Sequence, residues 1–406
     1  MKRKALTKTI FSFALTLLMT ATMALPVFAA GDPVIGSEGN SPEVALTKVF
    51  QMPEGTVTAA STFNFTAEKK DVNGNATTGA KDTMPAISIP SLTFSSGDSG
   101  STSLGVKTVA KQTAGDILSG LTWPHAGVFT YTITEAKTGY TIVDSKMESL
   151  AYSDAVYDLV VYVRDGASDL YVHAVSAIVK TVDTTSQAVG DKVNSSPGGA
   201  VATFSKMTFT NTYIAKTGDT NEDPESGIIA FELSKEVTGA FADRSKSFSF
   251  DVTLTSAAFI PAGATYTGYI IDDDGEVLGS SQTFTTGILK TIQLKHGQSL
   301  IFPLLPVGTT YLVEESADAD YTASYEIIVG GGAPISLSNP SPNTALSTTS
   351  RIILAGDNSS AFSNEYKEVT IAGLSTAFLP YLALLAIVLA AGAVMVATRK
   401  KKATTT

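Results

Sequence analysis

The sequence predicts an all-β protein with two tandem immunoglobulin-like β-sandwich domains, an N-terminal signal peptide and a C-terminal transmembrane helix. Three observations lead to this prediction. Apolar and polar residues alternate in many short runs between about Val44 and Lys367. Clusters of Gly, Asn, Asp and Ser separate these runs, and no long amphipathic helical stretch interrupts them. Four landmark residues also recur in the same order in the two halves of the chain, which indicates a distant repeat.

The first 29 residues have the features of a secretory signal peptide. The basic start MKRK is followed by a short apolar run and small residues, and Val27 and Ala29 suit positions −3 and −1 of a cleavage site. A first transmembrane helix is the alternative, but the apolar stretch is short and ends in LPVFAA. We therefore expect residues 1–29 to be removed and the following residues to be exported.

The C-terminal region has the features of a single-pass membrane anchor. Residues 369–398 contain no charged side chain, and four basic residues, 399–402, follow at once. About 20 apolar residues span a bilayer, and a basic cluster stays on the cytoplasmic side. We expect residues 369–398 to cross the cell membrane, residues 399–406 to form a cytoplasmic tail, and everything upstream to lie on the cell surface.

Charge and cysteine content exclude several classes of function. The formal net charge is −10, which argues against nucleic acid or an anionic membrane surface as partners. The chain has no cysteine, so disulfides, thiolate nucleophiles and cysteine-bound metals are excluded. We find no spaced set of histidines, nucleophile elbow or phosphate loop, so we expect no metal, no cofactor and no turnover enzyme.

The polar, acidic and turn-rich stretch IAKTGDTNEDPESG divides the alternating region into two parts. We expect a first β-sandwich over residues 30–213, a linker over residues 214–227 and a second β-sandwich over residues 228–368. The KTGD within the linker resembles part of a sortase sorting signal, but no membrane-length apolar segment follows it.

The repeated landmarks are a lysine in the first strand, a pair of phenylalanines, a glutamate at the end of a strand and an asparagine in the last strand. In the first half they are Lys48 in LTK, the pair in FNF, Glu135 in YTITE and Asn211 in FTNTY. In the second half they are Lys235 in LSK, the pair in FSF, Glu315 in YLVEE and Asn364 in FSNEY.

Strand parity predicts that these polar residues point into the apolar core. Residues two apart on a strand point the same way, and Lys48 has the parity of Leu46 and Phe50. Burial lowers the pKa of a lysine and raises that of a carboxylic acid, so a proton can pass between them and leave a neutral amine. This amine can attack an asparagine carboxamide while the glutamate shuttles protons. In the alternative reading, the lysines reach solvent and the acids cap turns or form surface ion pairs.

The motifs LTK, YTITE and FTNTY resemble the isopeptide-forming domain of Gram-positive backbone pilins. The second half, with KEVTG, FSFDVTLT, LPVGTTYLVEE and FSNEY, resembles a related pilin-like module of Firmicutes surface proteins. The resemblance implies sandwiches in which a first-strand lysine is bonded to a last-strand asparagine. Carried over by position, it implies one bond between Lys48 and Asn211 with Glu135 as proton shuttle. It implies a second between Lys235 and Asn364 with Glu315, because the adjacent glutamate has the opposite parity.

The resemblance implies a structural, pilin-like stalk on the cell surface. Its partners would be other pilin subunits or a sortase, although the chain has TIAGLSTAFLPY where such pilins carry Leu-Pro-x-Thr-Gly before the terminal helix. The alternative function is a surface adhesin, in which the same sandwiches present loops to a host or carbohydrate ligand.

Overall fold

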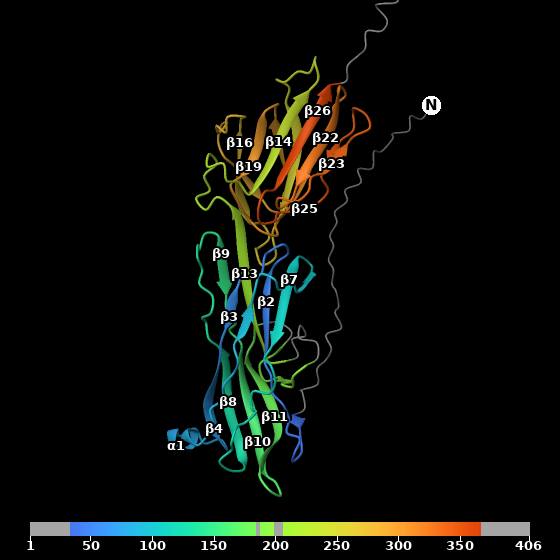
Figure 1. The fold of residues 1–406 in the computed structure, drawn as a ribbon. Helices are drawn as coiled ribbons and strands as arrows, with labels where there is room; N and C mark the ends of the chain where they lie inside the picture. The colour runs from blue at the N-terminus through green and yellow to red at the C-terminus, as the bar shows by residue number, and fades with distance from the viewer. Residues whose placement is uncertain (1–32, 184–186, 199–205, 367–406) are drawn as a thin grey trace, which may run out of the picture.

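The computed structural model describes residues 33–183, 187–198 and 206–366, and in these ranges it is built from β-strands with one short helix, α1 (Thr78–Asp82). The all-β prediction is confirmed. In Figure 1 the strands form two groups stacked along one long axis. The predicted signal peptide, membrane anchor and basic tail lie outside the described residues. Among the residues described, no helix is long and apolar enough to cross a membrane.

Two sheets and a small hairpin form the first group. One sheet has the order β1 (Val34–Ile35), β11 (Leu170–Thr181), β10 (Val156–Asp165), β8 (Gly127–Glu135) and β4 (Phe65–Val72), and β12 (Lys192–Val193) pairs with β11. The other has the order β20 (Leu304–Pro306), β13 (Thr208–Gly218), β2 (Thr47–Pro53), β7 (Val106–Gln112) and β6 (Ser101–Ser103), and β9 (Glu148–Ala151) pairs with β13. The hairpin pairs β3 (Ser61–Phe63) with β5 (Leu92–Phe94).

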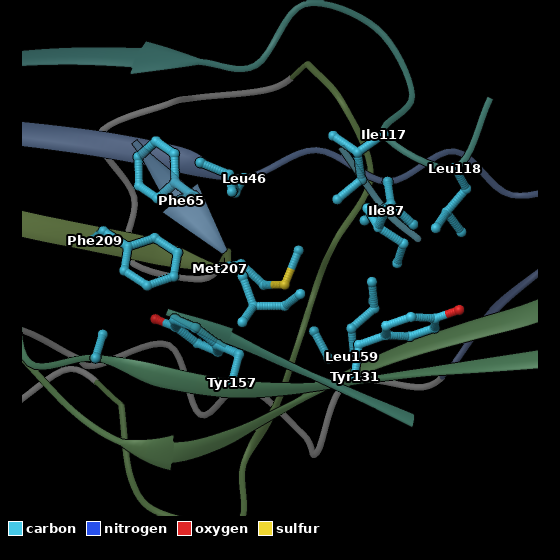
Figure 2. Close-up of a cluster of buried hydrophobic side chains, with 14 of the residues drawn as sticks. Leu46, Phe65, Ile87, Ile117, Leu118, Tyr131, Tyr157, Leu159, Met207 and Phe209 are labelled. Carbon is cyan, nitrogen blue, oxygen red and sulfur yellow. The ribbon is translucent and has the colours of Figure 1, made fainter. Parts of the chain in front are cut away.

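Aromatic and aliphatic side chains from both sheets fill the space between them, as Figure 2 shows. The ring of Phe209 on β13 lies 5.2 Å from Phe65 on β4 and 5.4 Å from Tyr157 on β10, between ring centres. The alternation of apolar residues along these strands places them on the inner faces. The first domain is therefore a sandwich closed by a continuous hydrophobic core.

The second group also has two sheets around its own core. The larger has the order β17 (Gln282–Thr285), β16 (Thr265–Ile271), β19 (Gln298–Phe302), β14 (Phe231–Thr238), β26 (Ser359–Tyr366), β22 (Tyr321–Ile328) and β23 (Ile335–Ser338). The smaller has the order β18 (Lys290–Leu294), β15 (Phe248–Thr255), β21 (Thr310–Glu315) and β24 (Leu346–Ser347), and β25 (Arg351–Ile352) pairs with β21.

In each domain, a strand close to its start lies beside its last strand and runs parallel to it. In the first domain β2 pairs with β13, and in the second β14 pairs with β26. All the other strand pairs in the described residues are antiparallel, apart from one isolated bridge. The parallel pairing brings residues from the two ends of each domain together.

The predicted linker over residues 214–227 begins too early. Residues 214–218 continue β13, which pairs with β9 and then with β20, a strand that comes from the second half of the chain. Figure 1 shows this strand running between the two groups. The turn-rich part, residues 219–227, does lie outside the strands. The polar side chains of Lys216 and Thr217 did not indicate a strand, because the partners of this segment are main-chain groups far away in the sequence.

Gly218, at the end of β13, lets two backbone segments approach each other closely where β13 meets the second half of the chain. Its φ angle is +105°, and a Cβ atom there would lie 1.9 Å from the Pro303 carbonyl oxygen. We expect Gly218→Ala to lower the free energy of unfolding by about 3 kcal/mol, because backbone strain and a main-chain clash add together. The matched control is Gly227→Ala, where φ is +72° and nothing lies within 4 Å, so that only the strain of about 1 kcal/mol remains. Scanning calorimetry measures both, and equal losses would contradict the prediction.

Candidate crosslinking sites

Lys48 and Asn211 lie on neighbouring parallel strands. Lys48 on β2 is opposite Phe209 on β13, so Asn211 lies two residues further along the same face. Both side chains are completely buried. Glu135 is the last residue of β8 in the facing sheet and is 7% exposed. The inward orientation predicted from strand parity is confirmed, and the fold brings these three residues, the first site, together.

The carboxylate of Glu135 bridges the other two side chains. Lys48 Nζ donates a hydrogen bond to Glu135 Oε2 at 2.6 Å, and Asn211 Nδ2 donates one to Oε1 at 2.8 Å. The carbonyl oxygen of the same amide, Asn211 Oδ1, accepts a hydrogen bond from the backbone N–H of Ser153 at 2.7 Å. The amine and the carboxamide are thus held on the two oxygens of one carboxyl group.

The second domain repeats this arrangement. Lys235 on β14 is opposite Phe362 on β26, so Asn364 again lies two residues further along. Glu315 ends β21 in the facing sheet, and all three polar side chains are buried. We call Lys235, Glu315 and Asn364 the second site. Two halves of the chain with little local similarity therefore build the same trio in the same strand register.

The second site has fewer hydrogen bonds than the first. Asn364 Nδ2 donates to Glu315 Oε1 at 2.8 Å. Lys235 Nζ lies 3.1 Å from the same oxygen as an ion pair, but it is not aligned for a hydrogen bond. Glu315 Oε2 and Asn364 Oδ1 are buried without a hydrogen-bond partner. The two sites share their composition but differ in how completely their polar atoms are satisfied.

The structure also separates Glu315 from its neighbour Glu314. Glu314 is exposed on the outer face of β21, whereas Glu315 is completely buried against Lys235 and Asn364. Successive residues of a strand point to opposite faces of the sheet, so only one of the two can enter the core. The parity argument therefore selected the glutamate that lies in the core beside Lys235 and Asn364.

The repeated phenylalanine pairs line the sites. Glu135 is paired across the strands with Phe65, and Glu315 with Phe250. The first phenylalanine of each pair lies beneath the lysine: Lys48 Nζ is 4.7 Å from the ring centre of Phe63, and Lys235 Nζ is 4.5 Å from that of Phe248. The rings remove water from the amine while their π faces tolerate its charge.

Burial shifts the pKa values of the two partners toward each other. Desolvation lowers the pKa of Lys48 to about 8 and that of Lys235 to about 8, although the glutamate charges act in the opposite direction. Desolvation also raises the pKa of Glu135 and of Glu315, against the charges of the lysines. Both shifts reduce the cost of moving a proton from the ammonium to the carboxylate, which leaves a neutral amine and a neutral acid.

This arrangement can join the lysine to the asparagine. The neutral amine adds to the carboxamide carbon and forms the new C–N bond. The carboxyl group takes a proton from the attacking nitrogen and gives one to the departing amide nitrogen. The old C–N bond breaks, ammonia leaves, and a secondary amide connects the side chains. No oxidant or cofactor is needed for this balance.

The reactive pair holds one proton, so bond formation has a pH optimum. Loss of this proton leaves a neutral amine beside a carboxylate that cannot polarise the amide. Since the pKa of Lys48 is about 8, we expect the rate to fall as the pH rises above about 8. Adding a second proton at acidic pH blocks the amine instead. To test this, protein that has been kept unfolded in urea since its synthesis is diluted into buffers of different pH. The loss of ammonia is then followed by mass spectrometry. A rate that kept rising to pH 10 would contradict this expectation.

Two residues near the first site were missed by the sequence analysis. Ser153 lies between β9 and β10, and Asp183 follows β11. Ser153 contributes its backbone N–H, and Asp183 contacts the segment that carries it. Neither has a counterpart among the repeated landmarks, and a backbone donor leaves no trace in residue type. The sequence therefore held no signal that could have identified them.

Two family matches cover most of the described chain. Residues 44–214 match the family described as a Spy0128-like isopeptide containing domain. Residues 230–366 match a domain of unknown function, DUF7601. The first match contains all of the first site, and the second contains all of the second site.

The chain is also similar to pilus proteins of Streptococcus pyogenes. It is 35% identical over 117 residues to the pilus tip adhesin Cpa, a match covering 28% of this chain and 15% of that protein. The chain thus spans about a seventh of the length of this relative. The crystal structure of the major pilin is 20% identical, covers 80% of this chain and 99% of its own, and has a TM-score of 0.33. The structure of the major pilin T-13 is 18% identical to this chain. The match covers 84% of this chain and 100% of the T-13 chain, with a TM-score of 0.31.

Residues 44–214 thus match a Spy0128-like isopeptide containing domain, and part of the chain is similar to a pilus protein of Streptococcus pyogenes.

Proposed function

We propose that this protein is a structural, pilin-like stalk on the cell surface, whose two immunoglobulin-like domains are each closed by a self-made lysine–asparagine isopeptide bond. The observation that carries the proposal is the bridging of Lys48 and Asn211 by the buried carboxylate of Glu135. Its near-repetition at the second site supports the same chemistry there. Disulfides close the domains of many exported proteins covalently. This protein has no cysteine, and isopeptide bonds would give it the same kind of covalent closure.

Further parts of the proposal depend on the sequence pattern of the two ends. We propose that residues 1–29 direct export and that residues 369–398 anchor the protein in the cell membrane, with residues 399–406 in the cytoplasm. Other pilin subunits are the partners that family membership favours, and a sortase would be needed to join them. Polymer ladders on immunoblots of cell-wall extracts would support this assembly, whereas a single monomer band would contradict it.

Adhesion is the second candidate function. The 35% identity with a pilus tip adhesin favours it, although that match covers 15% of the adhesin. A protein of this kind would bind a host or carbohydrate ligand through loops at the ends of its sandwiches. Saturable binding of the ectodomain to host cells or glycan arrays would support it.

The intact mass of a recombinant fragment of residues 31–368 tests the crosslinks. We expect it to be smaller than the sequence mass by two ammonia molecules. Glu135→Ala and Glu315→Ala should each restore one of them, while Glu314→Ala, which changes an exposed neighbour, should restore none. A wild-type mass equal to the sequence mass would exclude the bonds and would favour adhesion as the function.

A further inference from the structure

The carbonyl oxygen of the reactive asparagine has a hydrogen-bond donor at the first site and none at the second. Ser153 N–H donates to Asn211 Oδ1 at 2.7 Å in a buried environment. Asn364 Oδ1 is buried without a partner. This oxygen gains negative charge when the lysine amine adds to the amide carbon. A donor at 2.7 Å lies in the range that stabilises such an oxyanion.

Asp183 fixes the segment that carries this donor. The backbone N–H of Asp154 donates to Asp183 Oδ1 at 2.8 Å, and the hydroxyl of Ser153 donates to Oδ2. The backbone N–H of Thr210, the residue before Asn211, donates to the same Oδ2 at 2.8 Å. One carboxylate therefore holds both the donor segment and the strand of the reactive asparagine.

We propose that Asp183 is a positioning residue that holds the Ser153 N–H against the carbonyl oxygen of Asn211, so that the first isopeptide bond forms faster than the second. This inference rests on the proposed crosslinking function. The lysine nitrogen adds to the amide carbon, and the electron pair moves to Asn211 Oδ1, where the Ser153 N–H stabilises it. The pair then returns as the C–N bond breaks and ammonia, protonated through Glu135, departs.

The charge of Asp183 raises the pKa of both Glu135 and Lys48, so it favours the neutral acid but opposes the neutral amine. Burial is the main reason that the pKa of Glu135 is raised, and the nearby negative charge of Asp183 adds to this effect. A neutral Glu135 is the form that can donate a proton to the departing nitrogen. At the second site, Asp318 has a similar electrostatic effect on Glu315. The electrostatic effect of a nearby aspartate is thus common to both sites, whereas the first site alone has a backbone donor to the asparagine, beside its Lys48–Glu135 hydrogen bond.

A pulse-labelling experiment on the full chain tests the proposal. Newly made chains are labelled with heavy amino acids and chased, and the Lys48–Asn211 and Lys235–Asn364 crosslinked peptides are quantified after digestion. In the wild type we expect the first bond to form about tenfold faster or more, since removal of one oxyanion donor costs on the order of 100-fold in rate. In Asp183→Ala the first bond should slow by about tenfold or more. The second bond, in the same molecules, serves as an unchanged internal standard.

Two controls separate positioning from general stability. Asp116→Ala removes a carboxylate of the same domain that accepts hydrogen bonds from the backbone N–H groups of Val44 and Leu118. This carboxylate touches neither the Ser153 segment nor the strand of Asn211, so the first bond should form within about twofold of the wild-type rate. Asp183→Ala is also placed in the Glu135→Ala background, where no first bond forms, and its melting temperature reports the purely structural cost. A slowed first bond in a domain that still melts cooperatively supports the proposal.

The outcomes distinguish this inference from the proposed function. If wild-type chains form neither bond, the crosslinking function itself fails. If both bonds form but Asp183→Ala leaves the first rate unchanged, only the positioning role is overturned. A wild-type second bond as fast as the first would also overturn it, even if Asp183→Ala did not fold.

Discussion

Replacing Glu135 by alanine is expected to lower the free energy of unfolding of the first domain by about 5 kcal/mol. The proposed bond from Lys48 to Asn211 would close a loop of about 164 residues, and a crosslink of that span removes this much loop entropy from the unfolded chain on the model used for disulfides. Without the carboxylate the bond cannot form, and the amine stays buried without its acid. The change should be large enough to shift the unfolding midpoint by several molar urea.

Tryptophan fluorescence can measure this in the first domain alone. Trp123 is the single tryptophan of the chain; it is 7% exposed and packs on Phe129 at 4.9 Å between ring centres. The matched control is Glu315→Ala, which removes the other bond and should leave the Trp123 transition in place. If Glu135→Ala and Glu315→Ala gave the same Trp123 midpoint, the crosslink would not be the source of the stability.

The second large effect is expected on mechanical extension, when the protein is pulled from its two ends. In the wild type we expect neither domain to lengthen, because the proposed bonds would join Lys48 to Asn211 and Lys235 to Asn364. In Glu135→Ala the first domain should unfold in one step and add roughly 550 Å, the extended length of the residues it releases. Glu315→Ala should add roughly 440 Å instead. Atomic force microscopy resolves steps of this size.

Each variant also serves as the control for the other. The step must appear with the length of the domain whose glutamate is changed, while Glu314→Ala must add no step, since this side chain is exposed and outside the site. A long step in the wild type would show that the domains are held by noncovalent packing alone.

Much of the site could be predicted because strand parity is a local property. Lys48, Glu135 and Asn211 share faces with core residues that stand two positions away, and a side chain's face follows directly from its position in the strand. The repetition of the pattern identified which of many polar residues lie together in the core. The same reasoning selected Glu315 over Glu314.

Other features depend on contacts between distant segments. The extension of β13 through residues 214–218 depends on main-chain partners in β9 and β20, which polarity along the chain cannot reveal. Helix α1 contains no buried residue, so no hydrophobic pattern in the sequence predicts it. The Ser153 N–H is a backbone group, and only the fold places it on Asn211. Periodicity indicates which way a side chain points, but not which distant group it meets.

The run of β13 from one domain into the next has a topological consequence. Once both bonds are made, residues 48–211 and 235–364 are two closed covalent rings, and the backbone that joins them is residues 212–234 alone. A protease that cuts any loop within a ring opens it but leaves the molecule in one piece. Since residues 212–218 are held in a strand between β9 and β20, the cuts that would sever the protein between its rings are concentrated in the acidic turns that follow.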